Sequence, residues 1–370
     1  MTFSRYIHEL PEWPKFHYDR SALTDLLAEV RYHQGKLLGR MNSMGLDEKN
    51  LANLNTRLLD IKNTSEIEGD ILEKIQIRSS LARRLHMPLE SKVKAEKHVD
   101  DVVSMILRAT SLYNQKLTKE ELFKWHSMLF PEGLSGKREI VSGGWRNNPP
   151  SDPMQVVSGY HGKVRIHFQA PDSDRLENEI TSFLHWFNNV NNVDPVLKSA
   201  IAHLWFVTVH PFDDGNGRIA RAIGDRLLSL ADQSQYRFYS MSTQILKERK
   251  EYYSILERTQ RGTLDITEWL SWYLACLLRS INYAEKEMLA VDKLATFWKT
   301  YAKSDFNNRQ IKVLTMLLNE FEGNLTTSKW AKLASTSHDT ALRDINDLIE
   351  RKIIEKIDSG GRSTAYKLLR

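Results

Sequence analysis

The sequence predicts a mainly α-helical protein with one β-hairpin and a small C-terminal domain that combines helices with a second hairpin. Apolar residues recur every three or four positions through most of the 370 residues, which is the period of an amphipathic helix. Glycine and proline gather in one irregular segment, residues 132–171. The chain is long enough for two or three domains, and 41% hydrophobic residues allow a sizeable core.

Five helices are expected before the irregular segment. The first begins near Ser21, a candidate N-cap, and ends near Gly45. The fifth begins at the N-cap Thr118 and ends before Pro131, which cannot continue a helix. The three helices between them are expected at residues 51–69, 71–88 and 93–114.

A β-hairpin is expected inside the irregular segment, at residues 154–168. Its second half alternates apolar and polar residues, as a half-buried strand does, and its tip lies at residues 159–162. The apolar strand residues are Val156, Val157, Val164, Ile166 and Phe168.

Further helices follow the irregular segment, and the last seventy residues form a separate pattern. The helices are expected at residues 174–190, 195–209, 216–231, 243–260 and 265–289. In the tail, three short helices precede a two-stranded turn around Gly360 and Gly361. That order is typical of a winged helix-turn-helix domain. The tail helices are expected at residues 309–321, 326–335 and 337–354.

Composition argues against several classes of protein. No run approaches the roughly 18 apolar residues that a membrane span needs, so no membrane contact is expected. The N-terminal segment lacks the apolar core of a secretory signal peptide, so we expect a soluble, cytoplasmic protein. The single cysteine, Cys276, lies in an apolar run and is expected to pack in the core. The net charge of +5 is spread along the chain, which suits a phosphate-bearing ligand and is weak support for nucleic-acid binding.

The segment HPFDDGNGRIAR, residues 210–221, has the local pattern of an anion-binding loop. An apolar helix ends at His210, Pro211 breaks it, and Phe212 is expected to turn inward as an anchor. A new helix begins near Asn216. A glycine-rich loop before a helix leaves backbone N–H groups unpaired at the positive end of the helix dipole, and this arrangement binds phosphate.

The charged side chains of this segment fit phosphate chemistry. Asp214 is placed to hold a divalent cation such as Mg²⁺ that bridges phosphate oxygens. Arg218 and Arg221 lie three positions apart on one helix face, so both can reach a polyphosphate. The imidazole of His210 suits a general base near neutral pH. Phosphoryl or nucleotidyl transfer needs such a set of groups.

The segment resembles the motif of Fic domains, H-x-F-x-[DE]-G-N-G-R-x-x-R, at every specified position. Most Fic proteins transfer AMP from ATP to a hydroxyl group of a target protein, and their fold is a helical bundle with a β-hairpin flap. The resemblance implies a protein adenylyltransferase in which His210 is the base, Phe212 the core anchor and Asp214 the Mg²⁺ ligand. It also implies that the phosphates of ATP contact Gly215, Asn216, Gly217, Arg218 and Arg221.

The position of Gly217 bears on which group is transferred. Relatives that phosphorylate their targets typically carry a lysine there, so the glycine favours nucleotidyl transfer. The arginines would contact the β- and γ-phosphates.

A second segment, TSEIEG at residues 64–69, resembles the inhibitory-helix pattern [ST]-x-x-x-E-[GN] of the same family. Thr64 and Glu68 are four positions apart and share one helix face. In the proteins that it resembles, the glutamate pairs with the second arginine of the active motif, here Arg221. The resemblance therefore implies that Glu68 keeps Arg221 from the γ-phosphate and leaves ATP in a non-productive pose.

Three further features fit the resemblance. The hairpin would be the flap that aligns a target segment, through Val156, Val157, Val164 and Ile166. Tyr253 is expected to line the adenine pocket, with Tyr252 as the alternative. The N-terminal PEWPKFHYD resembles a helical region that often accompanies this subgroup.

The resemblance covers about residues 5–290 and implies three domains. They are an N-terminal helical region with the inhibitory helix, a Fic catalytic core and the winged-helix-like tail, at residues 1–100, 101–295 and 301–370.

The role of the tail is open between DNA binding and protein docking or dimerisation. Residues 301–370 hold 12 Lys and Arg against 9 Asp and Glu, a small excess. Arg343 and Arg362 are its well-placed cations, whereas Asp339, Asp344 and Asp347 on the expected recognition helix would repel DNA phosphates. Docking or dimerisation is therefore favoured.

Two alternatives stand beside the transferase. One is a transcriptional regulator whose Fic core senses nucleotide. The other is hydrolytic removal of AMP, for which Glu68 could position a water. Under the main hypothesis the partners are target proteins with a modifiable hydroxyl, the chain itself and a second copy in a homodimer.

Overall fold

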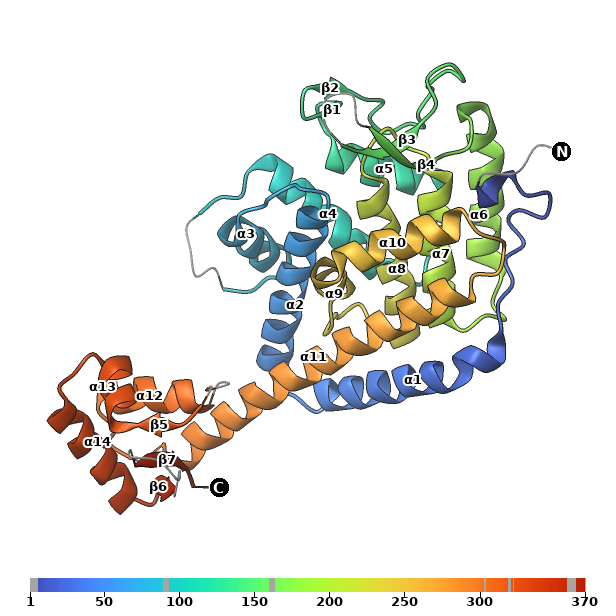
Figure 1. Cartoon of the computed structure of the whole chain (residues 1–370). Coiled ribbons are helices and arrows are strands. Elements are labelled where there is room, and N and C mark those ends of the chain that lie inside the picture. Colours follow the sequence, from blue (N-terminus) through green and yellow to red (C-terminus); the bar gives the residue numbers. More distant parts are fainter. Residues whose placement is uncertain are drawn as a thin grey trace. The chain divides into compact units, whose positions relative to one another are not determined.

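The computed structural model divides into two compact units, residues 1–284 and 285–370 (Figure 1). Helix α11 (Thr267–Thr300) contributes residues to both units. The structure describes residues 6–88, 93–159, 164–302, 304–318, 321, 323–357 and 364–369, without the side chains of residues 290–293 and 295.

Five helices precede the irregular segment, as the sequence predicts. The assignment of Ser21 as the first N-cap is wrong, because the carboxylate of Asp19 accepts hydrogen bonds from the backbone N–H groups of Ser21 and Ala22. A carboxylate is favoured at the positive end of a helix. Thr118 caps the fifth helix as predicted and accepts from the N–H of Glu121. The helices are α1 (Arg20–Asn42), α2 (Leu46–Ile67), α3 (Lys74–Arg84), α4 (Lys97–Ser111) and α5 (Lys119–Leu129).

The predicted β-hairpin is present and contains a β-bulge. It consists of the antiparallel strands β3 (Gln155–Ser158) and β4 (Arg165–Gln169). Of the predicted tip, residues 160–162 lie outside the described residues. A shorter hairpin of β1 (Leu134–Ser135) and β2 (Arg138–Glu139) precedes it.

Helices α7 (Pro195–Val209) and α8 (Asn216–Asp232) pack against each other in the core of the first unit (Figure 1). Every residue of α7 from Val196 onward is buried, which matches a sequence that is apolar on all faces. The single helix predicted at residues 243–260 is instead two helices that meet at Glu248, whose carboxylate binds Arg279 of α11 at 2.6 Å. The remaining helices are α6 (Leu176–Asn189), α9 (Met241–Lys247) and α10 (Arg249–Gln260), with short 3₁₀ turns at Ile7–Glu9 and Ser173–Arg175.

The second unit has its own small core around Trp330, which is fully buried. The three predicted helices and the hairpin are present, and the short strand β5, which was not predicted, joins the hairpin in the sheet order β5–β7–β6. The predicted turn at Gly360 and Gly361, together with Arg362, lies outside the described residues. The elements are α12 (Asn308–Leu318), β5 (Leu325–Thr326), α13 (Thr327–Ala334), α14 (His338–Glu350), β6 (Ile354–Ile357) and β7 (Ala365–Leu368). Its classification as a winged helix stays a prediction.

The aspartates of α14 are placed differently from the sequence expectation. Asp344 is buried and accepts hydrogen bonds from Arg309 at 2.8 and 2.9 Å. The expectation that it would repel DNA phosphates is therefore wrong, because its charge is used inside the unit to hold α12 against α14. Asp347 is partly buried and paired with Arg351 at 3.0 Å, whereas Asp339 is exposed.

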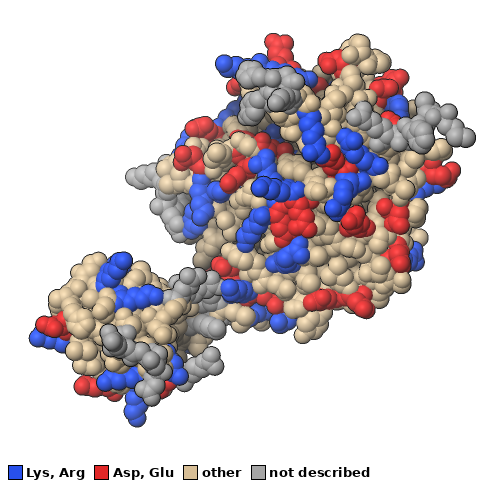
Figure 2. All heavy atoms as spheres, viewed as in Figure 1, with Lys and Arg blue, Asp and Glu red and all other residues tan. Residues whose placement is uncertain are grey.

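The surface and the helices agree with the compositional expectations. Figure 2 shows Lys and Arg side chains interspersed with Asp and Glu on the visible face of each unit. Cys276 is buried in α11, as predicted. Within the described part of the chain, no helix has both the length and the apolar character that a membrane crossing requires.

Candidate active site

The segment between α7 and α8 forms a tight loop, and two residues in the left-handed backbone conformation shape it. His210 ends α7 with a φ of 50°, and Gly215 precedes α8 with a φ of 78°. A side chain at Gly215 would meet the ring of Phe130 at 2.8 Å, so glycine is needed there for space as well as for conformation. Helix α8 begins at Asn216, as the sequence predicts.

Phe212 and Asn216 hold the loop from inside. Phe212 is fully buried. The side chain of Asn216 accepts a hydrogen bond from the backbone N–H of Phe212 at 3.0 Å and donates one to its carbonyl at 2.8 Å. The amide side chain of Asn216 is therefore occupied by the loop, and what it can offer a ligand is its backbone N–H at the start of α8.

His126 on α5 supports the loop from outside, and the sequence reading missed it. Its ring stacks on Phe212 with centroids 4.2 Å apart and planes at 7°. The N–H of Gly143 donates to Nδ1 at 3.1 Å, so Nε2 carries the proton and donates to the carbonyl of Asp214 at 3.2 Å. Burial lowers the pKa of His126 to about 4, which keeps the ring neutral and both hydrogen bonds in place near pH 7.

A carboxylate lies over the N-terminus of α8. A Cβ atom built at Gly217 would clash with Oε1 of Glu68, so no other residue fits at Gly217 while Glu68 is in this place. Glu68 directly follows α2, as its C-cap. The first backbone N–H groups of a helix attract negative charge, and Glu68 supplies that charge here.

Arg221 points from α8 to the same carboxylate. Its Nη2 lies 2.8 Å from Oε1 of Glu68, and it also donates to Thr64, at 2.7 Å to the hydroxyl and 2.9 Å to the carbonyl. Thr64 and Glu68 therefore hold one guanidinium together. Burial acts to lower the pKa of Arg221, but the Glu68 carboxylate together with the nearby Tyr252 and Tyr253 outweighs burial, and the pKa is raised.

Arg218 is held by a different carboxylate, which the sequence reading also missed. Its Nη1 lies 3.3 Å from Oδ2 of Asp70, and its guanidinium stacks over the ring of Phe130 at 5.0 Å. Asp70 lies two residues beyond Glu68 and also binds Nε2 of His98 on α4 at 3.2 Å. The hydrogen bond from His98 is the main cause of the lowered pKa of Asp70, so its carboxyl group is ionised near neutral pH.

His210 presents one free ring nitrogen to the pocket. Its Nδ1 donates to the carbonyl of Val207 at 3.1 Å, which leaves the lone pair on Nε2. Burial lowers the pKa of His210 to about 4, and nearby Arg146 lowers it further. Arg146 also fixes the backbone, because its Nε donates to the carbonyl of His210 at 2.8 Å. The imidazole is therefore neutral and able to accept a proton at pH 7.

Asp214 lines the same pocket and is oriented by its neighbours. Its carboxylate accepts hydrogen bonds from the hydroxyl of Ser135 and from the backbone N–H of Gly215. In the described residues no three His, Cys, Asp or Glu side chains cluster as a metal site. Mg²⁺ characteristically takes only one or two carboxylates and completes its shell with phosphate oxygens and water, so Asp214 fits such an ion.

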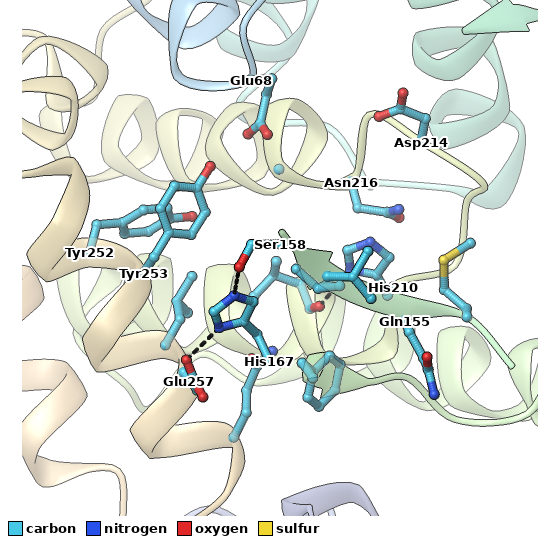
Figure 3. A pocket seen from close by; sticks show the side chains of 18 of the residues that line it. Glu68, Gln155, Ser158, His167, His210, Asp214, Asn216, Tyr252, Tyr253 and Glu257 are labelled. Atoms are coloured by element: carbon cyan, nitrogen blue, oxygen red, sulfur yellow. Dashed lines mark hydrogen bonds and ion pairs between the residues drawn. The ribbon is translucent and has the colours of Figure 1, made fainter. Parts of the chain in front are cut away.

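One pocket of about 720 Å³ is lined by six of these residues, Glu68, His210, Asp214, Gly215, Asn216 and Gly217 (Figure 3). Arg218 and Arg221 are buried and are not among its lining residues. Its walls are the 210–217 loop, Glu68, the hairpin and α10. Tyr252 and Tyr253 of α10 both line it. Tyr253 is 38% exposed, whereas Tyr252 is buried and its hydroxyl lies 2.9 Å from Nε2 of His203. The choice of Tyr253 over Tyr252 for an adenine contact stays a prediction.

The four candidate flap residues divide into two pairs. Val156 and Val157 are among the residues that line the pocket. Val164 is 61% exposed, and the carbonyl of Ile166 accepts a hydrogen bond from Arg261 of the first unit at 2.8 Å. Three polar residues of the same region, Ser158, His167 and Glu257, line the pocket and were not singled out from the sequence.

Fold and site together define a pocket on a helical core, with a neutral imidazole at one lip and a carboxylate over a helix N-terminus. The sequence matches the Fic/DOC family over residues 116–228 and a domain of unknown function (DUF4172) over residues 6–87. Residues 116–228 of the chain therefore form a Fic domain.

Solved structures agree with this fold. A Fic family protein from Desulfovibrio desulfuricans superposes with a TM-score of 0.54 at 19% identity, covering 95% of this chain and 97% of that one. A Fic-domain signaling protein from Bacteroides thetaiotaomicron gives a TM-score of 0.50 at 20% identity, covering 71% and 95%.

Curated relatives are named as protein adenylyltransferases. A probable protein adenylyltransferase of Aquifex aeolicus is 31% identical over 122 residues, which is 32% of this chain and 36% of the relative. The protein adenylyltransferase Fic of Drosophila mojavensis is 26% identical over 222 residues, which is 58% and 39%. This chain therefore spans little more than a third of the length of these relatives.

Proposed function

We propose that this chain is a protein adenylyltransferase, which moves AMP from ATP to a hydroxyl group of a target protein, and that Glu68 inhibits it. One observation carries the proposal: the Glu68 carboxylate, which lines the pocket that contains His210, lies over the N-terminus of α8 and pairs with the buried Arg221. A carboxylate in that position marks a site that attracts an anion. The names of the curated relatives supply the reaction class.

The triphosphate of ATP would take the place of the Glu68 carboxylate. Gly217 has no Cβ, so a phosphate can approach the backbone at the start of α8. Arg218 and Arg221, which would contact the β- and γ-phosphates, each have a buried nitrogen without a hydrogen-bond partner among the described residues, Nε and Nη1 respectively. A buried charged donor without a partner is costly, so both nitrogens favour an incoming phosphate oxygen.

His210 would act as the base in the transfer step. The target oxygen forms a bond to the α-phosphorus, the bond from that phosphorus to the bridging oxygen of the β-phosphate breaks, and pyrophosphate leaves. The hydroxyl proton passes to Nε2 of His210. Because Nδ1 is already bonded to the carbonyl of Val207, the ring is fixed in the tautomer that can accept it.

Mg²⁺ would be held by Asp214, whose carboxylate is oriented by Ser135. When bound, the ion would neutralise charge on the phosphates and help to position them. The protein groups that complete the phosphate site are the N-terminus of α8 and the two arginines.

The hairpin would receive the target. Within the described residues β3 and β4 form a two-stranded sheet, so its edges can accept a further strand. Val157 is 52% exposed and Val164 61% exposed, which gives a target segment apolar side chains to pack against. The hydroxyl of that segment would then face the pocket near His210.

A labelling experiment tests the proposal. Purified protein is incubated with ATP labelled on the α-phosphate, Mg²⁺ and a cell lysate, and labelled proteins are separated on gels. We expect weak labelling by the wild type, strong labelling by Glu68→Gly, and loss of lysate labelling in Glu68→Gly combined with His210→Ala. An absence of label from folded Glu68→Gly protein, with calorimetry showing no ATP binding, would refute the proposal.

Hydrolytic removal of AMP is a second candidate function. The Glu68 side chain is 28% exposed and lines the pocket, so its carboxylate could orient a water toward a bound adenylylated residue. Under this alternative, wild-type protein would release AMP from labelled lysate proteins, and Glu68→Gly would not.

The regulator hypothesis gains from the burial of Asp344, which removes one phosphate-repelling group from α14. It predicts salt-sensitive binding of the full chain to DNA fragments in a gel shift.

A further inference from the structure

Three side chains of the pocket form a chain of hydrogen bonds from a hydroxyl to a carboxylate (Figure 3). Oγ of Ser158, the last residue of β3, lies 2.6 Å from Nε2 of His167 on β4. Nδ1 of the same ring lies 2.7 Å from Oε2 of Glu257 on α10. All three line the pocket that contains His210 and Gly217.

The direction of these hydrogen bonds is set by Glu257. Its other oxygen, Oε1, is paired with Arg165 at 2.9 Å and lies 3.6 Å from Arg261. Burial raises the pKa of Glu257, but the hydrogen bonds from His167 and Arg165 outweigh it and the pKa is lowered. An ionised Glu257 can only accept, so Nδ1 of His167 donates to it; in the neutral ring this leaves the lone pair of Nε2 facing the hydroxyl of Ser158.

A β-bulge places His167 in this chain of contacts. Val156 pairs with Phe168 and Val157 pairs with Ile166, so His167 is the extra residue of β4. The carbonyl of His167 leaves the strand ladder and accepts a hydrogen bond from Arg261 at 3.0 Å. A bulge re-aims a side chain, and this one turns His167 toward Ser158 instead of leaving it in regular alternation.

A serine hydroxyl held by the lone pair of a histidine, whose other nitrogen binds a carboxylate, is an activated nucleophile. Ser158 is exposed, so its oxygen can reach a ligand of the pocket. A purely structural role for Ser158 would be to fasten the hairpin to α10. The hairpin is already fastened there without Ser158, by the ion pair of Arg165 with Glu257 and by two hydrogen bonds from Arg261 to the backbone of β4.

We propose that Ser158 is a modification site of this chain: its hydroxyl, activated by His167 and Glu257, takes the nucleotidyl group of the nucleotide bound in the pocket. The proposal rests on the proposed function, because the pocket must hold ATP. It differs from the transfer to a target protein in two ways: the acceptor is a particular residue of the hairpin, and His167, not His210, is the base.

In the transfer of AMP to Ser158, Oγ of Ser158 forms a bond to the α-phosphorus of ATP. The bond from that phosphorus to the oxygen that bridges to the β-phosphate breaks. The hydroxyl proton passes to Nε2 of His167, and the resulting imidazolium is stabilised by Glu257. Pyrophosphate is the leaving group, and the product is a phosphodiester between Ser158 and AMP.

The modification would change the hairpin that receives targets. Ser158 is the last residue of β3, directly after Val156 and Val157. An adenylyl group there would fill part of the pocket and add a charged phosphodiester beside the strand edge. Modified chains would therefore accept targets less well than unmodified ones.

The test uses full-length Glu68→Gly protein with ATP and Mg²⁺, intact mass spectrometry and peptide mapping. We expect one adenylyl group on the peptide that contains Ser158. Adding Ser158→Ala should remove that label, and His167→Gln should slow its formation by more than tenfold, since a positioned base contributes about 10²–10⁴. Ser151→Ala is the matched control, because Ser151 is exposed on the same segment and is not among the residues that line the pocket. It should label as the parent does.

A second measurement probes the nucleophile without ATP. A fluorophosphonate reagent forms a bond to activated serine oxygens, and we expect it to label Ser158 in the parent but not in Glu257→Gln, where the amide no longer stabilises the imidazolium. Adenylylation that maps to other residues, or that forms at Ser158 in His167→Gln as fast as in the parent, would overturn the inference and leave the proposed function intact. If no Glu68→Gly protein is adenylylated and none binds ATP, the proposed function itself fails.

Discussion

Replacing Glu68 by glutamine should make the protein less stable and more active at the same time. The substitution keeps the size of the side chain and removes its charge. Arg221 is buried, with 3% of its side chain exposed, and Glu68 is 28% exposed. Removing one partner of a fully buried ion pair costs about 3–5 kcal/mol. The partial exposure of Glu68 and the two remaining hydrogen bonds from Arg221 to Thr64 reduce the expected loss of folding free energy to about 1–3 kcal/mol.

Under the proposed function, the same free energy would oppose ATP binding in the wild type, because Arg221 and the start of α8 would have to release Glu68 before a phosphate could bind. Since about 1.4 kcal/mol corresponds to a tenfold change, Glu68→Gln should raise the initial rate of AMP transfer about 5- to 100-fold at subsaturating ATP. Urea unfolding without nucleotide gives the stability, and α-labelled ATP gives the rate. Glu66→Gln is the matched control, because Glu66 lies on the same helix, pairs with Lys62 and is not part of the pocket lining.

A destabilised Glu68→Gln protein whose rate is no higher than that of the wild type would refute the reasoning. The contact between Glu68 and Arg221 would then be structural only, and the inhibitory role would have to be abandoned.

Three further predictions concern the loop and its ion. Burial lowers the pKa of both His126 and His210 to about 4, below the value of about 6.5 in an unfolded chain, so the unfolded state binds more protons between these pH values. Stability measured by urea unfolding should therefore fall as pH decreases from about 6.5 to 4 and should gain nothing further from these two groups above that range. If stability began to fall already above pH 7 as the pH was lowered, and if His126→Phe showed the same fall, the lowered pKa assigned to His126 would be contradicted. His126→Phe preserves the stacking on Phe212 and loses both hydrogen bonds, so it should cost about 1–3 kcal/mol of folding free energy and lower the affinity for ATP in calorimetry. Asp214→Asn should raise the Mg²⁺ concentration that half-saturates AMP transfer, and chelation by EDTA should stop transfer, whereas full activity of both the variant and the chelated protein would exclude a Mg²⁺ role for Asp214.

The helices and the central loop could be predicted because their signals are local. Apolar residues at helical spacing give α1 to α8 to within a few residues, and Pro211 and Gly215 mark the ends of the loop. The sequence prediction of the N-cap of α1 was wrong by two residues. Asp19 caps this helix instead of Ser21, because the Asp19 carboxylate binds two backbone N–H groups at once.

The supports of the site could not be predicted because they come from contacts between distant segments. His126 reaches Asp214 across 88 positions, and Asp70 reaches Arg218 across 148. No periodicity connects such residues. The bulge at His167 is also invisible in the sequence, because an extra residue in a strand changes side-chain direction without changing composition.

Under the proposed function, inhibition and ATP binding would compete for the same positive charge, and this would set what a releasing signal has to do. Glu68 lies over the N-terminus of α8 and pairs with Arg221, and Asp70, two residues further on, pairs with Arg218 and His98. A partner that binds the inhibited and the released state equally well shifts nothing, however tightly it binds. A ligand of the hairpin alone would leave both carboxylates in place. Under the proposed function we therefore expect a releasing signal to bind the released state more tightly through the segment that carries Glu68 and Asp70, and its effect on activity could not exceed that difference in affinity.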